Sequence, residues 1–223
     1  MASTMYSRRA LFLSAAGLLT AGCAGNPILR SVKSAASRAA GLPQDVEIDR
    51  ATIAKIPYAT IRAKFGGGPA SLLVLNSTDG LNRDWVASDN TLLVTRAGRL
   101  VNTYGFAANL RRVAFEGVDP LAAHPQKIDG SVDYQMRYDL ETKALNVVDV
   151  ISRLEAVGPE TITIADLDFK TVHLREKCRV PTIKWHFEND YWVDVYDGFV
   201  WRSRQHFAQG LPPLTIEVLK PSA

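Results

Sequence analysis

Residues 92–103 read LLVTRAGRLVNT. The two outer runs, 92–96 and 99–103, consist largely of aliphatic and β-branched residues, and only Ala97-Gly98 separates them. A two-residue linker that contains glycine is typical of a β-hairpin, because such turns need positive φ, which glycine adopts without a steric penalty. The stretch therefore predicts two antiparallel strands joined by a tight turn.

Alternating polar and apolar residues also occur before this hairpin. Residues 58–65 alternate, residues 71–75 form a short apolar run, and Gly66-Gly67-Gly68-Pro69 lies between them. The glycine-rich segment is expected to be a turn. It does not match a phosphate-binding loop, because no Gly-Lys-Ser/Thr follows it to open a helix.

Strand patterns continue to the C-terminus. We expect strands at 131–138, 145–154, 162–164, 172–174, 183–187, 191–196, 199–203 and 214–219. Residues 145–154 also fit a helix, but their β-branched pairs favour a strand. Asp197-Gly198 is predicted to form a two-residue turn, and residues 107–113 could form a short helical turn around Leu110.

About a dozen short strands separated by turn residues favour an all-β domain. We expect residues 45–223 to form one domain, an antiparallel meander that makes a curled sheet, a sandwich or a half-barrel. Apolar residues at helical spacing between residues 25 and 41 predict a short N-terminal helix before this domain.

The N-terminus has the layout of a secretory signal. Arg8 and Arg9 supply positive charge, residues 10–21 are uncharged, and Cys23 follows a run of small residues. The apolar run is shorter than the roughly 20 residues needed to cross a bilayer. Residues 1–22 are therefore interpreted as a cleavable signal peptide.

The end of this signal resembles the bacterial lipobox. Residues 19–23 read LTAGC, with Thr20 where Leu, Val or Ile is commoner. In proteins with this motif the cysteine receives diacylglycerol and its new amino terminus is acylated, and several acyl chains anchor a protein stably where one does not. We expect lipidation at Cys23, with palmitate, and a lipidated tether with the short helix over residues 23–44. The alternative is an ordinary signal in which the cysteine stands by chance.

Two features bear on the route and the destination. Arg8-Arg9 fits a twin-arginine export signal, but it fits the positive segment of an ordinary signal equally well. In Gram-negative lipoproteins, Asp directly after the lipidated cysteine resembles an inner-membrane retention signal. Ala24 stands at that position, which indicates the periplasmic face of the outer membrane.

Composition excludes several classes of partner. Of the 223 residues 47% are hydrophobic, which is typical of a globular chain. The net charge of +3 falls to +1 once Arg8 and Arg9 leave with the signal, so no strong field for nucleic acid or for an anionic surface remains. If Cys23 carries lipid, Cys178 has no disulfide partner, and we expect it to be a small buried strand residue.

The sequence contains few patterns that indicate chemistry. The four histidines form neither His-x-His nor His-Glu-x-x-His, and Gly-x-Ser-x-Gly is absent. We therefore predict no metal, no cofactor and no catalytic residue. Asp166 and Asp168 could form a carboxylate pair for glycoside hydrolysis, but a solvated strand face is the simpler interpretation.

Aromatic residues and arginines gather in the C-terminal third. Aromatic faces pack against sugar rings and arginine binds acidic groups, although large aromatics on strands also fill cores. Tyr191 and Val193 should face the core, which leaves Trp192 on the more solvated face. The candidate binding surface comprises Trp192, Asp194, Tyr196, Trp201, Arg202 and Arg204.

Several segments match a known family in order. Residues 56–61 read IPYATI, close to a family opening of IPYASI, with Thr60 in place of serine. Further matches are Trp85 and the segments 95–101, 103–105, 189–193, 200–205 and 220–221. Over about residues 45 to 221 the chain resembles the YjbF-type lipoproteins, also called the group 4 capsule or GfcB-like lipoprotein family.

The resemblance implies an all-β outer-membrane lipoprotein that is encoded with exopolysaccharide or capsule assembly genes and has no known catalytic activity. The leading hypothesis is a non-enzymatic accessory factor in polysaccharide assembly or secretion. Its partners would be the membrane, through the lipid on Cys23, and a polysaccharide or proteins of the export machinery. The alternatives are an enzyme that acts on surface polysaccharide and a carrier of lipid or lipoprotein.

Overall fold

A computed structural model describes residues 49–141 and 147–222 of the chain. The signal peptide over 1–22, the lipidation site Cys23 and the short helix predicted between 25 and 41 lie outside the described residues. Within them, no helix is long and apolar enough to cross a membrane.

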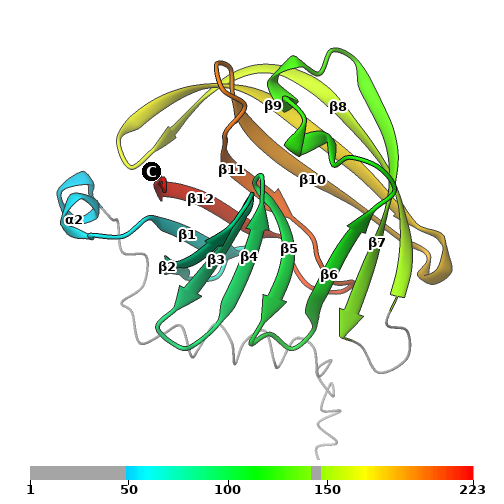
Figure 1. Cartoon of the computed structure of the whole chain (residues 1–223), viewed down its shortest axis with the longest axis horizontal. Coiled ribbons are helices and arrows are strands. Elements are labelled where there is room, and N and C mark those ends of the chain that lie inside the picture. The colour runs from blue at the N-terminus through cyan, green and yellow to red at the C-terminus, as the bar shows by residue number, and fades with distance from the viewer. Residues whose placement is uncertain (1–48, 142–146, 223) are drawn as a thin grey trace, which may run out of the picture.

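Twelve strands and one α-helix make up the described part of the chain, together with short 3-10 turns (Figure 1). The helix is α2 (Arg50–Lys55). The strands are β1 (Thr60–Phe65), β2 (Ala70–Asp79), β3 (Asn82–Ala87), β4 (Leu92–Arg96), β5 (Arg99–Tyr104), β6 (Asn109–Phe115), β7 (Ser131–Glu141), β8 (Val147–Ile164), β9 (Leu167–Val180), β10 (Trp185–Asp194), β11 (Val200–Gln205) and β12 (Leu214–Lys220). The 3-10 turns are η2 (Pro120–Ala122), η3 (Pro125–Lys127) and η4 (Pro181–Ile183).

All twelve strands belong to one antiparallel sheet. Its order is β5-β4-β3-β2-β1-β12-β11-β10-β9-β8-β7-β6. The chain therefore runs as a meander, and the pairing of β1 with β12, with Thr60 opposite Lys220, curls the sheet into a nearly closed barrel (Figure 1). The predicted all-β meander and curled sheet are confirmed, and the alternative of a sandwich is wrong because no second sheet forms among the described strands.

Side chains bridge the seam between the two edge strands, β5 and β6. Asn102 Nδ2 donates to the carbonyl of Arg111 at 2.6 Å, and the backbone N–H of Leu110 donates to Thr103 Oγ1 at 2.9 Å. Polar side chains thus take the place of a continuous ladder of backbone hydrogen bonds. They satisfy backbone groups that an open sheet edge would leave unpaired.

The hairpin over residues 92–103 forms as predicted. Ala97 and Gly98 both have positive φ, +47° and +83°, and β4 pairs with β5 on either side of them. The tip of this hairpin bends across the lumen to β11, where Gln205 Nε2 donates to the carbonyl of Gly98 at 2.9 Å.

Three expectations about local structure are wrong. Residues 107–113 form no helical turn, because β6 begins at Asn109 and pairs with β7. From residue 147 onward, the strands expected at 145–154 and 162–164 are parts of the single strand β8, which continues through a bulge at Gly158 that interrupts the alternation. Residues 145 and 146 lie outside the described residues. Residues 195–199 connect β10 to β11, in place of a two-residue turn, because Asp194 N–H already bonds to the carbonyl of Phe199.

The sequence does not predict helix α2, which lies near the start of the all-β domain expected over residues 45–223. Asp49 caps it, since its side chain accepts a hydrogen bond from the Thr52 N–H at 2.8 Å. Ile53 is buried and packs with Ile164 and Leu219, so the helix covers the outer face of the sheet beside the end of β12.

The two ends of the barrel differ. Every second connection of a meander lies at the same end, and at one end the rings of Phe65, Phe106 and Phe207 meet with centroids 5.2–5.8 Å apart. This closed end is filled by apolar side chains. The opposite end carries the β2–β3, β4–β5, β6–β7, β8–β9 and β10–β11 connections and the end of β12, and we call it the mouth end.

Candidate functional site

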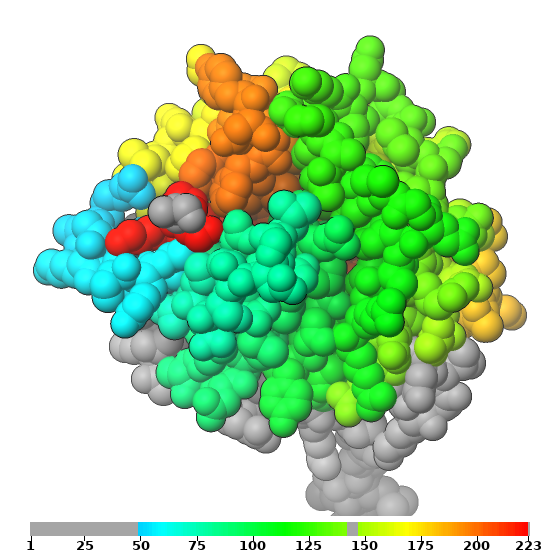
Figure 2. Space-filling model, viewed as in Figure 1, coloured from blue at the N-terminus to red at the C-terminus, as the bar shows by residue number. Residues whose placement is uncertain are grey.

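A cavity of about 390 Å³ lies at the mouth end. Turns that are distant in sequence build it: the β2–β3 and β4–β5 turns, the segment between β6 and β7, the β10–β11 connection and the end of β12. In Figure 2 these elements meet around a hollow on the face shown. The volume is within the range of pockets that bind small molecules.

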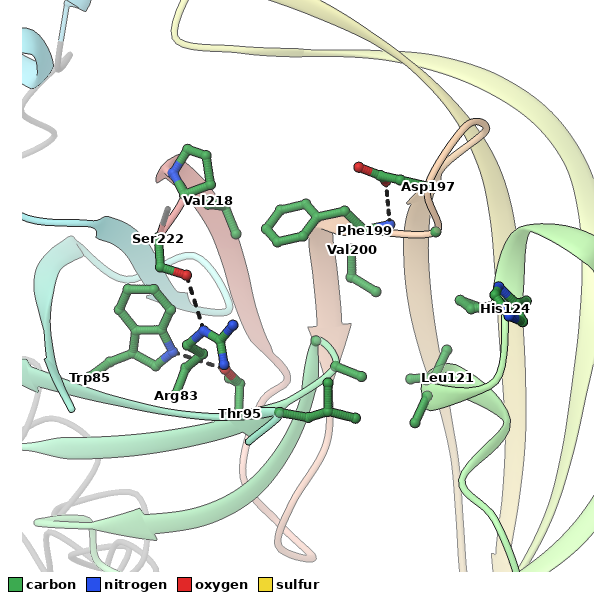
Figure 3. A pocket seen from close by; sticks show the side chains of 17 residues that line it. Arg83, Trp85, Thr95, Leu121, His124, Asp197, Phe199, Val200, Val218 and Ser222 are labelled. Carbon is green, nitrogen blue, oxygen red and sulfur yellow. Dashed lines mark hydrogen bonds between the residues drawn. The ribbon is translucent and has the colours of Figure 1, made fainter. Parts of the chain in front are cut away.

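The lining of this cavity is mainly apolar. Figure 3 shows Trp85 on one side, Leu121 on the opposite side, and Phe199 and Val200 between them. The indole N–H of Trp85 is already satisfied by Thr95 Oγ1 at 2.9 Å. The walls therefore offer hydrophobic contact more than hydrogen bonds.

A few polar groups stand around this apolar space. Arg83 donates through Nε to Ser222 Oγ at 3.1 Å (Figure 3). It also donates through Nη1 to the carbonyl of Gly80 at 2.9 Å. Asp197 accepts a hydrogen bond from the backbone N–H of Phe199 at 2.8 Å. His124 also lines the cavity, from the segment before η3.

A buried ion-pair network lies beside the cavity. Arg99 follows the cavity-lining Gly98, and its guanidinium contacts Glu176 at 2.9 Å and Asp119 at 3.1 Å. Arg99 is 1% exposed and Glu176 is fully buried. Tyr134 and Tyr191 complete the set through their hydroxyl groups.

Electrostatics keep these groups charged in spite of their burial. Burial lowers the pKa of Arg99, but the charges of Asp119 and Glu176 outweigh it and hold this pKa well above its ordinary value. Burial likewise raises the pKa of Glu176, but Arg99 and hydrogen bonds from Tyr134 and Asn189 outweigh it, so that this pKa is lowered. The network joins β5, β7, β9 and β10. Because its charges are paired with one another, its role is structural and it offers no reactive group.

The sequence-predicted surface falls on the outer face of the sheet. As expected, Tyr191 and Val193 are fully buried and Trp192 is half-buried. Trp192 stacks on His173 with ring centroids 4.8 Å apart, and the Arg202 guanidinium lies 5.6 Å from its ring. The tip of the β8–β9 hairpin packs near these side chains, since Ile164 belongs to the apolar cluster against which Trp192 packs.

The other members of that surface are spread along β10 and β11. Trp201 donates to Asp194 Oδ2 at 2.8 Å, which brings two of the predicted residues together. Arg202 pairs with Glu217 at 2.7 Å, while Tyr196 is 79% exposed in the β10–β11 connection. Arg204 is exposed and lies 3.7 Å from Asp190. Trp192, Arg202 and Arg204 thus lie on the outer face of the sheet, whereas Tyr196 lies in the connection at the mouth end. The role of the six residues in binding stays a prediction.

The carboxylates considered for hydrolysis do not form an isolated pair. Asp166 lies in the β8–β9 turn with a φ of +64°, and Asp168 accepts a hydrogen bond from Thr163 at 2.7 Å. Residues 49–141 and 147–222 contain no group of His, Cys, Asp and Glu side chains that could hold a metal ion. Cys178 is buried in β9, and burial raises the pKa of its thiol well above the ordinary value.

Sequence reasoning missed both the cavity and the network. The cavity takes Leu81, Leu121 and Phe199 from three separate connections, and no local pattern links them. The sequence identifies Arg99 only as the first residue of a strand, because its carboxylate partners lie far away at Asp119 and Glu176.

Comparison with known proteins places this architecture in a family. Residues 20–219 match the family model described as "Group 4 capsule polysaccharide lipoprotein gfcB, YjbF". The chain belongs to the YjbF family. The match begins at Thr20, within the lipobox-like segment, and includes all twelve strands except the last residue of β12.

Relatives of this YjbF-family chain occur in Escherichia coli (strain K12). The uncharacterized lipoprotein GfcB is 28% identical over 214 residues, which are 96% of this chain and 99% of GfcB. The uncharacterized lipoprotein YjbF is 27% identical over 175 residues, 78% of this chain and 81% of that protein. The crystal structure of the hypothetical lipoprotein YmcC from E. coli (K12) superposes with a TM-score of 0.69 at 26% identity, and covers 84% of this chain and 95% of YmcC.

Proposed function

We propose that this protein is a lipid-anchored lipoprotein on the periplasmic face of the outer membrane and acts there as a non-enzymatic accessory factor in exopolysaccharide or capsule assembly or secretion. The family match over residues 20–219 carries the proposal, because it joins the Cys23 segment to a family of capsule polysaccharide lipoproteins. The relatives GfcB and YjbF are both lipoproteins.

In this proposal the chain has three parts. Residues 1–22 direct export and are removed, residues 23–44 form the lipidated tether, and residues 45–223 form the working domain. The membrane is one partner, reached through the lipid on Cys23. A polysaccharide or a protein of the export machinery is the other.

The geometry of the acidic residues supports a non-enzymatic role. Asp194 accepts hydrogen bonds from Trp201 and Tyr196, Asp197 accepts one from Phe199, and Asp168 accepts one from Thr163. Each of these carboxylates thus accepts hydrogen bonds from within the hairpin to which it belongs. Retaining and inverting glycosidases instead need two carboxyl groups on opposite sides of one bond.

A deletion strain tests the proposal. Under conditions that induce the polysaccharide, removal of the gene is expected to reduce the surface and secreted polysaccharide, and a plasmid copy is expected to restore it. Polysaccharide yields equal to those of the parent strain would contradict the proposed function. Purified protein that releases new reducing ends from the polysaccharide would support the enzyme alternative.

The apolar cavity favours a second candidate, a protein that binds lipid. A curled antiparallel sheet with one closed end and one open end can hold an apolar ligand in a cavity at its open end. This candidate does not exclude a role in polysaccharide secretion.

A further inference from the structure

Exposed apolar residues occur in several parts of the sheet, with Tyr104 and Val147 at the closed end, and a group of them lies at the mouth end. Large hydrophobic side chains with 36–79% exposure stand on the approach to β1, on the β2–β3 turn, on the segment after β6, at the β8–β9 turn and on the β10–β11 connection. They are Tyr58, Leu81, Val118, Leu167, Tyr196 and Phe199. A ring of apolar tips from separate turns is a feature of surfaces that contact other apolar surfaces.

The cavity inside this ring favours an apolar ligand. Its walls include Trp85, Leu121 and Val200, and the transfer of an alkyl chain from water to such walls is favourable. A sugar would fit poorly, because its hydroxyl groups need hydrogen-bond partners and would lose those that water supplies.

Arg83 adds a preference for negative charge at the rim. It lines the cavity, and no carboxylate in residues 49–141 and 147–222 forms an ion pair with it; its hydrogen bonds go to Ser222 Oγ and to the carbonyls of Gly80 and Asn82. A guanidinium whose hydrogen bonds within the described residues go only to a hydroxyl and to carbonyl oxygens is suited to bind a carboxylate or a phosphate. The site therefore combines an apolar chamber with a cation at its edge.

The chain also enters the domain at this end. Helix α2 leads into β1, whose first residue Thr60 lies opposite Lys220 at the end of β12. Residues 24–48 can span at most about 85 Å. If Cys23 is lipidated as proposed, this tether joins the domain at its mouth end and keeps that end within reach of the membrane.

We infer that the mouth cavity binds one fatty-acyl chain of an anionic membrane lipid, with the acidic head group at Arg83 and the apolar ring against the bilayer surface. The inference rests on the membrane anchorage in the proposed function but not on the role in polysaccharide secretion. The occupant is a lipid of the surrounding membrane, not the acyl chains on Cys23.

Binding of oleate tests the chamber. The full chain with Cys23→Ser is titrated with oleate by calorimetry, since it carries no acyl chains of its own, and saturable one-to-one binding is expected. Ala122 lines the cavity while Ala123 does not. Ala122→Trp is therefore expected to weaken binding at least about tenfold, and Ala123→Trp is the matched control that leaves it unchanged.

A second variant keeps the test valid if Ala122→Trp fails to fold. Phe199→Asp places a charge in the cavity from a side chain that is already 36% exposed, and should also weaken binding about tenfold. Absence of saturable binding, or binding that neither Ala122→Trp nor Phe199→Asp weakens while both variants stay folded, would overturn the inference.

A charged probe and an uncharged probe together test the role of Arg83. Arg83→Gln is expected to weaken oleate binding about tenfold, the size of a lost charge-assisted hydrogen bond, and to leave oleyl alcohol binding unchanged. Arg96→Gln, at an exposed arginine outside the cavity lining, serves as the control. An equal loss for both probes would contradict a head-group site at Arg83.

The source of the acyl chain is tested with the lipidated protein. Native mass spectrometry should detect oleate on lipidated wild-type protein as well as on the Cys23→Ser chain. Oleate on the Cys23→Ser chain alone would mean that the protein's own anchor fills the cavity, which overturns the inference. A deletion strain that loses polysaccharide, together with a chain that binds no oleate, would leave the proposed function standing and remove only this inference.

Discussion

Gly98 is the residue at which turn geometry and packing coincide. Its φ of +83° lies in the region that favours glycine, and a Cβ atom there would stand 2.4 Å from Val200 Cβ. Val200 is buried in β11 and lines the cavity, so it cannot move aside as a flexible surface side chain could. Glycine is therefore required for the hairpin tip to close over the lumen.

Substitution of Gly98 measures this requirement. Gly80 is the matched control, because it also has positive φ in a turn but a Cβ atom added to it would meet no other atom within 4 Å. Gly80→Ala should cost about 1–2 kcal/mol for its backbone conformation, and Gly98→Ala about 3 kcal/mol or more because overpacking adds to it. Urea denaturation of both variants checks the difference, and equal losses would show that the contact with Val200 does not matter.

Glu176 gives the stability of the protein a pH dependence. The pKa of Glu176 is lowered in the folded protein, whereas a glutamate in the unfolded chain has a pKa of about 4.3. A group with a depressed folded pKa contributes stability that is complete above the unfolded value and is lost as the pH falls through the folded value. The network around Arg99 should therefore weaken below about pH 4.3.

The variant Glu176→Gln isolates this contribution. At pH 7 it should lower the free energy of unfolding by about 3 kcal/mol, since Arg99 loses a buried ionic partner. Between about pH 5 and pH 3 its stability should fall less steeply than that of the wild type, measured by urea unfolding at each pH. Glu116→Gln, at an exposed glutamate, is the control. If the free energy of unfolding falls equally steeply with pH in Glu176→Gln and in the wild type, Glu176 is not the source of the pH dependence.

At the scale of elements, the seam between β5 and β6 depends on side chains. Thr103 is buried and its hydroxyl accepts the hydrogen bond from the backbone N–H of Leu110. A valine has nearly the same shape but offers no acceptor, so this buried donor would be left unsatisfied.

Thr103→Val is accordingly expected to cost about 1–3 kcal/mol and to speed hydrogen exchange at the Leu110 amide. Thr78→Val, at an exposed threonine on β2, should leave both the stability and this exchange rate unchanged. If the Leu110 amide exchanges at the wild-type rate in Thr103→Val, the seam is held by other contacts.

Local chemistry determined which elements could be predicted. The hairpin at Ala97-Gly98 is encoded by its own turn residues, and alternation identified β7 and β12. The bulge at Gly158 breaks the period of two, which divided β8 into two apparent strands. Helix α2 escaped notice because its six residues bury only Ile53.

The site was harder to predict than the fold, for a reason that belongs to the whole molecule. The cavity exists only because the pairing of β1 with β12 curls the sheet and gathers five connections at one end. The predicted surface around Trp192 came from one short segment, in which Tyr191 and Val193 are buried as expected, but Tyr196 lies beyond the end of the strand. Contacts that join distant hairpins, such as the hydrogen bond from Arg202 to the carbonyl of Thr163 at 2.8 Å, cannot be predicted from a local pattern.

Anchorage is a property of the whole chain and rests on Cys23. We expect Cys23→Ser to abolish labelling with palmitate and to release the protein from the outer-membrane fraction. The β-sheet should stay folded, because all twelve of its described strands lie between residues 60 and 220, after the substituted position. A Cys23→Ser protein that still takes up palmitate and fractionates with the outer membrane would show that the lipobox interpretation is wrong.

The most direct test of the central claim is the amount of surface and secreted polysaccharide made by a deletion strain that carries either the wild-type gene or Cys23→Ser at matched protein levels. The wild-type gene should restore the parental amount, and Cys23→Ser should leave most of the defect, because the domain would no longer be held at the membrane. Full restoration by the unanchored protein would contradict a lipid-anchored role, and an unaltered amount of polysaccharide in the deletion strain itself would contradict any role in its assembly or secretion.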